Sequence, residues 1–94
     1  MPRSDVIARR YFVRGRVQGV GFRYFAQRAA AQLGVTGFTR NLDDGRVEVY
    51  AVGQPEKLSE LAGWLWKGPR FAGVRGVEEQ EAAVELYDTF QIEG

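Results

Sequence analysis

The sequence contains neither cysteine nor histidine. Without cysteine the chain forms no disulfide and offers no thiolate nucleophile, which also fits a reducing compartment. Phosphatases that pass through a phosphocysteine or phosphohistidine intermediate are therefore excluded. Zinc sites built from histidine or thiolate ligands are excluded as well. A magnesium site built from carboxylates alone stays open.

The sequence also has little net charge and no long apolar run. Thirteen basic residues stand against twelve acidic ones, a net charge of +1 at pH 7, whereas nucleic-acid-binding domains usually carry a strongly basic face. No apolar run approaches the roughly 20 residues of a membrane span, and residues 1–5 lack the apolar core of a signal peptide. The composition predicts a soluble cytoplasmic protein with neither nucleic acid nor membrane as a partner.

The chain length and the apolar pattern predict one domain over residues 1–94, whose first seven residues form a loose tail because a terminus without packing partners frays. Aromatic and β-branched residues indicate strands over residues 9–14, 35–42 and 46–52. Apolar residues at helical spacing indicate helices over residues 22–33 and 55–67.

The C-terminal quarter is harder to interpret from its pattern. Residues 74–84 should contain a fourth strand, although the acidic run Glu78–Glu81 indicates either a solvent-exposed edge or a broken pairing. Residues 90–92 alternate and indicate a short last strand. The order strand, helix, strand, strand, helix, strand is that of the ferredoxin-like split βαβ arrangement. We therefore expect an α+β fold, an antiparallel sheet with two helices on one face.

Two tryptophans lie on the second predicted helix. Trp64 and Trp66 are two residues apart, so both cannot face the core, and we expect one of them to be at least partly exposed. A ligand site built on a tryptophan is an alternative to a purely structural role.

A glycine-containing loop joins the first strand to the first helix. Residues 15–23 read G-R-V-Q-G-V-G-F-R. Glycine permits the positive φ angles with which successive backbone N–H groups form an anion-binding nest, and a helix N-terminus favours anions. Arg23 adds a planar fork of donors suited to phosphate oxygens. We interpret this loop as a phosphoryl-binding site, although its glycine spacing fits neither the P-loop nor the dinucleotide fingerprint.

The whole string is more specific than its glycines. Residues 15–23 closely resemble the signature loop of the acylphosphatases. Residues 37–41 read G-F-T-R-N and are followed by Gly45, Val47 and Gly53, which resembles the second motif of that family. The resemblance covers about residues 8–92 and implies the same ferredoxin-like fold.

The resemblance also implies an activity and a site. The activity is hydrolysis of the carboxyl–phosphate bond of acyl phosphates, without metal, organic cofactor or covalent enzyme intermediate. Inorganic phosphate would be product and inhibitor, and the enzyme a monomer. Arg23 matches the arginine that binds phosphate and Asn41 the asparagine that orients water. The cradle would consist of the backbone N–H groups of Arg16, Val17, Gln18, Gly19 and Val20.

The residues themselves agree with a water nucleophile. The only serines, Ser4 and Ser59, lie in the tail and on a helix away from the loop. An acyl phosphate releases a carboxylate whose conjugate acid has a pKa of about 4, so its departure needs no general acid. The Asn41 amide can accept one hydrogen bond and donate another, which suits it to hold a water in line. In the family a phosphate oxygen of the substrate is thought to take the proton of that water.

Two departures from the family pattern are visible. Thr39 stands where the motif usually has a small apolar residue, and we expect little effect because threonine suits a strand. The acidic run Glu78–Glu81 makes the fourth strand unusually polar, which could alter stability or attract a partner.

Two other functions stay open at this stage. Ferredoxin-like sheets also serve as RNA platforms that stack bases on strand aromatics, but residues 46–52 lack the aromatic pair of that motif. A partner-binding domain that has lost the reaction is the other alternative, and the presence of both Arg23 and Asn41 argues against it. The physiological acyl phosphate is open too, because the sequence identifies no pocket for the acyl group, which favours broad acceptance.

Overall fold

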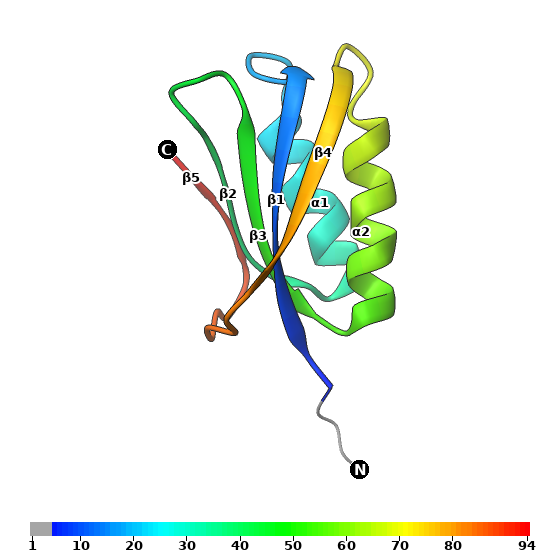
Figure 1. The fold of residues 1–94 in the computed structure, drawn as a ribbon, viewed down its shortest axis with the longest axis vertical. Coiled ribbons are helices and arrows are strands. Elements are labelled where there is room, and N and C mark those ends of the chain that lie inside the picture. Colours follow the sequence, from blue (N-terminus) through cyan, green and yellow to red (C-terminus); the bar gives the residue numbers. More distant parts are fainter. Residues whose placement is uncertain (1–4) are drawn as a thin grey trace.

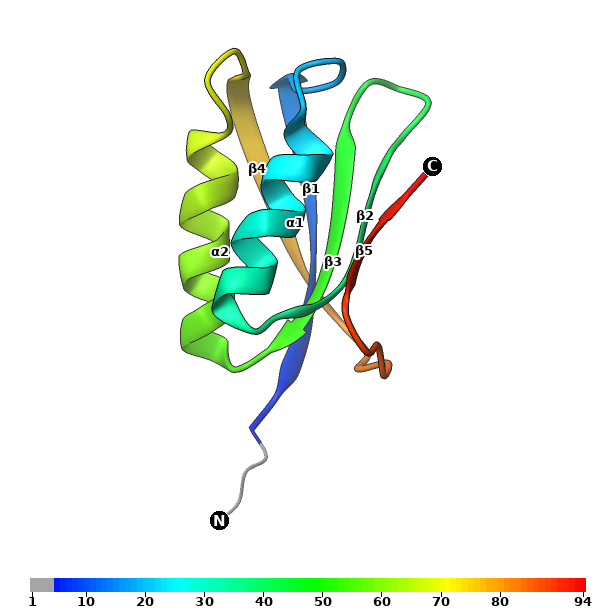
Figure 2. The same cartoon turned by 180° about the vertical axis from the view of Figure 1, so that it is seen from behind.

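The computed structural model describes residues 5–94, in which a five-stranded sheet carries two helices on one face (Figure 1). Seen from behind, both helices lie in front of the sheet (Figure 2). The elements are β1 Ile7–Arg16, α1 Phe22–Leu33, β2 Thr36–Asn41, β3 Val47–Gly53, α2 Pro55–Lys67, β4 Gly73–Ala82 and β5 Phe90–Glu93. Their order and layering confirm the predicted ferredoxin-like α+β fold. No helix within the described range has the length and apolar character needed to cross a membrane.

The strand order across the sheet is β4-β1-β3-β2-β5. The first four strands pair antiparallel, as predicted, whereas β5 runs parallel to β2. The reason is that β4 ends at the end of the sheet where β2 begins (Figure 1), so residues 83–89 bring β5 in beside β2 in the same direction. The sheet is therefore mixed, and its C-terminal strand lies next to the strand that ends at Asn41.

The structure corrects two expectations, one about the N-terminal tail and one about the acidic run. Ile7 pairs with Gly53 and so belongs to β1 rather than to the expected tail, of which residues 1–4 lie outside the described residues. The acidic run Glu78–Glu81 stays paired with β1 on an exposed edge, so the expectation of an edge is right and that of a broken pairing is wrong. Charged residues on an edge strand discourage pairing with other chains.

The hydrophobic core lies between the helices and the sheet. Both helices have the predicted bounds and bury apolar stripes, and alternate residues of β3 face them. Large side chains that are fully buried there are Tyr11, Phe22, Leu58, Leu61 and Leu65. The Tyr11 hydroxyl donates to the Leu58 carbonyl oxygen at 3.2 Å, and burial raises the pKa of Tyr11 to about 12. This hydrogen bond ties β1 to α2.

Both tryptophans of α2 lie outside this core. Trp64 is 41% exposed and Trp66 is 53% exposed. The expectation that at least one of them is exposed therefore holds for both, since leucines fill the buried face of α2.

The sheet face without helices holds a buried carboxylate. Glu48, 3% exposed, forms salt bridges with Arg10 and Arg40 on the two neighbouring strands, and Arg40 Nε donates to Glu48 Oε1 at 2.6 Å. Burial by itself raises the pKa of the Glu48 carboxyl, but the hydrogen bonds from Arg40 and Arg10 outweigh it and hold the pKa below its ordinary value. The bridge joins β1, β3 and β2, so it supports the register that sets Asn41 opposite Val47.

Replacing Glu48 by glutamine should lower the free energy of unfolding at pH 7 by about 1–3 kcal/mol, because charge-assisted hydrogen bonds become weaker neutral ones. The folded protein holds the pKa of Glu48 below its unfolded value. Its contribution is therefore fully present above about pH 4.3 and is lost as pH falls through the folded pKa. Urea unfolding at pH 7 and pH 3 should show a smaller acid loss for Glu48→Gln than for the wild type. The exposed Glu81→Gln is the control, and a Glu48 variant as acid-sensitive as the wild type would refute the assignment.

Candidate active site

The loop between β1 and α1 depends on two glycines with left-handed backbone. Gly19 and Gly21 have φ angles of +75° and +77°, and a Cβ at either position would meet no atom within 4 Å. The conformation, and not a lack of space, therefore requires glycine here. Gly21 is the N-cap residue of α1 and has no side chain that could accept a hydrogen bond from the first amides of the helix. The N-terminal amides of α1 consequently stay available to an external anion.

Arg23 lies on the first turn of α1 beside Phe22, which is buried in the core. Its Nη1 donates to the backbone carbonyl oxygen of Glu93 at 2.9 Å. One bond uses only part of a guanidinium that carries five N–H donors. The C-terminal strand thus orients Arg23 while leaving donors for a ligand.

Asn41 is the last residue of β2 and lies on the same face of the strand as Thr39, two residues before it. That face carries the helices, because Thr39 and Asn41 pair with Val49 and Val47, which are buried in the core. Thr39 itself is buried and its hydroxyl donates to the Glu48 carbonyl oxygen at 2.9 Å, so threonine fits the strand as expected. Within residues 5–94 the Asn41 amide has no protein hydrogen-bond partner.

A cavity of about 190 Å³ brings the two predicted residues together. It is formed by the loop, the start of α1, the end of β2 and β5, and its lining comprises Val17, Gly19, Gly21, Phe22, Arg23, Tyr24, Asn41 and Ile92. The proximity of Arg23 and Asn41, which the sequence could not establish, is thus a feature of the fold. The arrangement can hold an anion at the loop and a polar group at Asn41.

The predicted cradle residues are distributed around this cavity. Val17 and Gly19 line it, and the Val17 side chain is also buried in the core. Arg16 ends β1 and is exposed, while Val20 lines a larger neighbouring cavity. Tyr24 and Ile92 also line the cavity but were not identified from the sequence. For Ile92 the reason is that nothing in the sequence placed β5 beside the loop.

The Gln18 side chain has a structural role that the sequence did not reveal, in addition to the role proposed for its backbone N–H. Its Nε2 donates to the carbonyl oxygens of Leu42 and Arg46 at 2.8 and 2.9 Å. These acceptors belong to the turn between β2 and β3, immediately after Asn41. The amide therefore fastens the glycine loop to the hairpin. No side-chain pattern could have revealed it, since both acceptors are backbone atoms.

The described residues contain no group of three or more histidine, cysteine, aspartate or glutamate side chains that could hold a metal ion. The carboxylate-only magnesium site that composition left open therefore has no carboxylate cluster to hold it in that range.

Comparison with known proteins identifies relatives that match most of the chain. The acylphosphatase family model matches residues 9–92. An acylphosphatase of Solibacter usitatus is 74% identical over 85 residues, 90% of this chain and 88% of the relative. One from Archaeoglobus fulgidus is 47% identical over 87 residues, 93% of this chain and 98% of the relative.

Solved structures give the same result. The structure of an acylphosphatase from Coxiella burnetii superposes with a TM-score of 0.91 at 37% identity, covering 95% of this chain and 94% of that one. These matches include the glycine loop and the strand that ends at Asn41, the two segments that meet at the cavity. The chain therefore belongs to the acylphosphatase family, hydrolases that act on acid anhydrides.

Proposed function

We propose that the cavity between the loop and β2 is the place where this enzyme hydrolyses acyl phosphates, with Arg23 binding the phosphoryl group and Asn41 orienting the attacking water. The observation that carries the proposal is the meeting of these two side chains in one cavity of about 190 Å³. They come from segments 18 residues apart in sequence.

The phosphoryl group would lie at the N-terminus of α1. Backbone N–H groups of Arg16, Val17, Gln18, Gly19 and Val20 would surround it, and the helix end favours an anion. The guanidinium of Arg23 would stabilise charge on the equatorial oxygens of a loose transition state. Because the Glu93 carbonyl already fixes Arg23, little reorganisation is needed when substrate binds.

The water would be positioned rather than strongly activated. The Asn41 amide, without a protein partner in the described chain, can accept a hydrogen bond from water and hold it in line with the phosphorus atom. A phosphate oxygen of the substrate would take the proton, and the carboxylate leaves unaided because it is a weak base. The proposed reaction uses no metal, organic cofactor or covalent intermediate. Inorganic phosphate, the product, would compete with the substrate for the same cradle.

We also propose a monomeric enzyme located in the cytoplasm, as the composition and the family resemblance led us to expect. The RNA-platform alternative is disfavoured by the sheet face opposite the helices. Tyr50, its central aromatic residue on β3, is 1% exposed and stacks on Phe38 with ring centroids 5.5 Å apart, with Tyr87 at 5.8 Å. A ring covered in this way cannot stack on a base.

Arg23→Ala should lower kcat/KM for acetyl phosphate by at least about 10²–10³, because a preorganised donor to the transferring group is lost. It should also weaken competitive inhibition by inorganic phosphate. Arg23→Lys should recover only part of the activity, since lysine keeps the charge but not the fork. Steady-state assays with excess chelator measure both constants. Arg75→Ala, an exposed arginine on β4, is the control, and wild-type activity in Arg23→Ala would exclude the assigned role.

Asn41→Ala should lower kcat by a similar factor, about 10²–10³, while inorganic phosphate still inhibits as well as it does in the wild type. The amide acts on the water and not on the bound phosphate, so turnover and anion binding should separate. The neighbouring Asp43→Ala, in the turn, tests for a general effect of altering this hairpin. An unchanged kcat in Asn41→Ala would refute the proposal that the Asn41 amide orients the water.

Deleting Glu93 and Gly94 removes the carbonyl oxygen that accepts from Arg23. A hydrogen bond from a charged donor contributes about 1.5–3 kcal/mol, so we expect kcat/KM to fall about tenfold or more. Deletion of Gly94 alone keeps a Glu93 oxygen, now part of the C-terminal carboxylate, that still accepts from Arg23, and serves as the comparison. The measurements are kinetics with acetyl phosphate and thermal unfolding of both truncated chains, the second to check that each chain is folded. Equal activities of the two chains would show that the Glu93 carbonyl does not position Arg23.

A further inference from the structure

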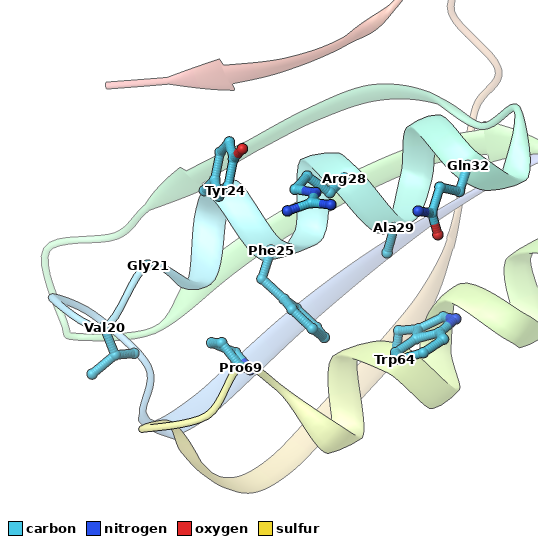
Figure 3. Close-up of a pocket in the computed structure, with 9 residues that line it drawn as sticks. All are labelled: Val20, Gly21, Tyr24, Phe25, Arg28, Ala29, Gln32, Trp64 and Pro69. Carbon is cyan, nitrogen blue, oxygen red and sulfur yellow. The ribbon is translucent and has the colours of Figure 1, made fainter.

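A second, larger cavity of about 460 Å³ lies between α1 and α2 (Figure 3). Figure 3 shows Phe25 extending from α1 toward Pro69 and Trp64, with Val20 and Gly21 at the end where the glycine loop enters the helix. Arg28 and Gln32 are the polar side chains that line it. Apart from Val20, whose backbone N–H belongs to the proposed cradle, the residues that line this cavity have no part in the proposed phosphoryl chemistry.

The two cavities are neighbours that share part of their lining. Gly21 and Tyr24 border both the larger cavity and the one that contains Arg23 and Asn41. Tyr24 is 58% exposed, and the Arg28 guanidinium carbon lies 5.7 Å from its ring centroid. Gly21 and the Tyr24 ring therefore stand at the boundary between the two cavities.

The walls of the larger cavity are suited to a flat apolar group. Phe25 is half-buried and meets Trp64 edge-to-face, with ring centroids 6.2 Å apart. Val20 and Pro69 add aliphatic surface at the loop end. Ligand pockets of this size are typically lined by apolar and aromatic side chains with a few polar groups. Aromatic rings gain from edge-to-face and offset contacts beyond simple burial.

We propose that this cavity is a subsite for the acyl part of the substrate and that it favours aromatic acyl groups over acetyl. The inference rests on the proposed placement of the phosphoryl group at Arg23. It replaces the expectation of broad acceptance, which the sequence favoured because it identified no acyl pocket. Trp64 is then a specificity-determining residue remote from the bond that breaks.

The test compares benzoyl phosphate with acetyl phosphate in three proteins. Trp64→Ala should lower kcat/KM for benzoyl phosphate about five- to tenfold, the scale of a lost aromatic contact, and leave acetyl phosphate unchanged. Trp66→Ala is the matched control, since Trp66 is exposed on the same helix and does not line the cavity. Equal losses on both substrates, or the same selective loss in Trp66→Ala, would overturn the subsite.

A binding measurement keeps the inference independent of turnover. The chain has two tryptophans, so Trp66→Phe leaves Trp64 as the only indole fluorophore. Benzylphosphonate, which is not hydrolysed, should change the Trp64 fluorescence, whereas inorganic phosphate should not, and Trp64→Phe should respond to neither. If benzylphosphonate binds and the Trp64 fluorescence stays unchanged, the subsite is refuted. Full activity of Arg23→Ala on acetyl phosphate would instead refute the proposed phosphoryl site.

Discussion

The geometry of the site depends on two hydrogen bonds from one amide. Gln18 Nε2 holds the carbonyl oxygens of Leu42 and Arg46 at 2.8 and 2.9 Å, which fastens the glycine loop to the turn after Asn41. The loop is otherwise held through β1 and the β2–β3 turn through the hairpin, so their separation would vary if each moved alone. Because one donor group serves both acceptors, these hydrogen bonds restrain the distance between the proposed phosphoryl cradle and the proposed water-orienting amide.

The rest of the fold supports this link from both sides of the sheet. On the helix side, buried Phe22 anchors the first turn of α1 and so the neighbouring Arg23. On the open side, the bridge through Glu48 joins β1, β3 and β2 and supports the register of the hairpin. In the proposed mechanism stability and function are therefore coupled, since loosening either side of the sheet would move Arg23 or Asn41.

The sequence predicted those features that depend on local periodicity. Both helices, the hairpin and the two motifs are encoded by spacing and by glycine, so their bounds agree closely with the structure. The parallel placement of β5 was not predictable, because strand partners far apart in the sequence are chosen by the course of the whole chain. For the same reason the contact of Arg23 with the Glu93 carbonyl had no signal in the sequence. The roles of Arg23 and Asn41 remain proposals supported by their shared cavity.

In the proposed arrangement the two neighbouring cavities take the two halves of an acyl phosphate. The smaller one offers fixed donors and a permanent cation to the phosphoryl end, and the larger one offers aromatic walls to the acyl end. A bond that breaks without a general acid needs the protein mainly to hold these halves in place. In the proposed arrangement the Tyr24 ring stands at the boundary between them. Trp64, left outside a core filled by leucines and in contact with Phe25, would then gain a further aromatic partner when the acyl group enters.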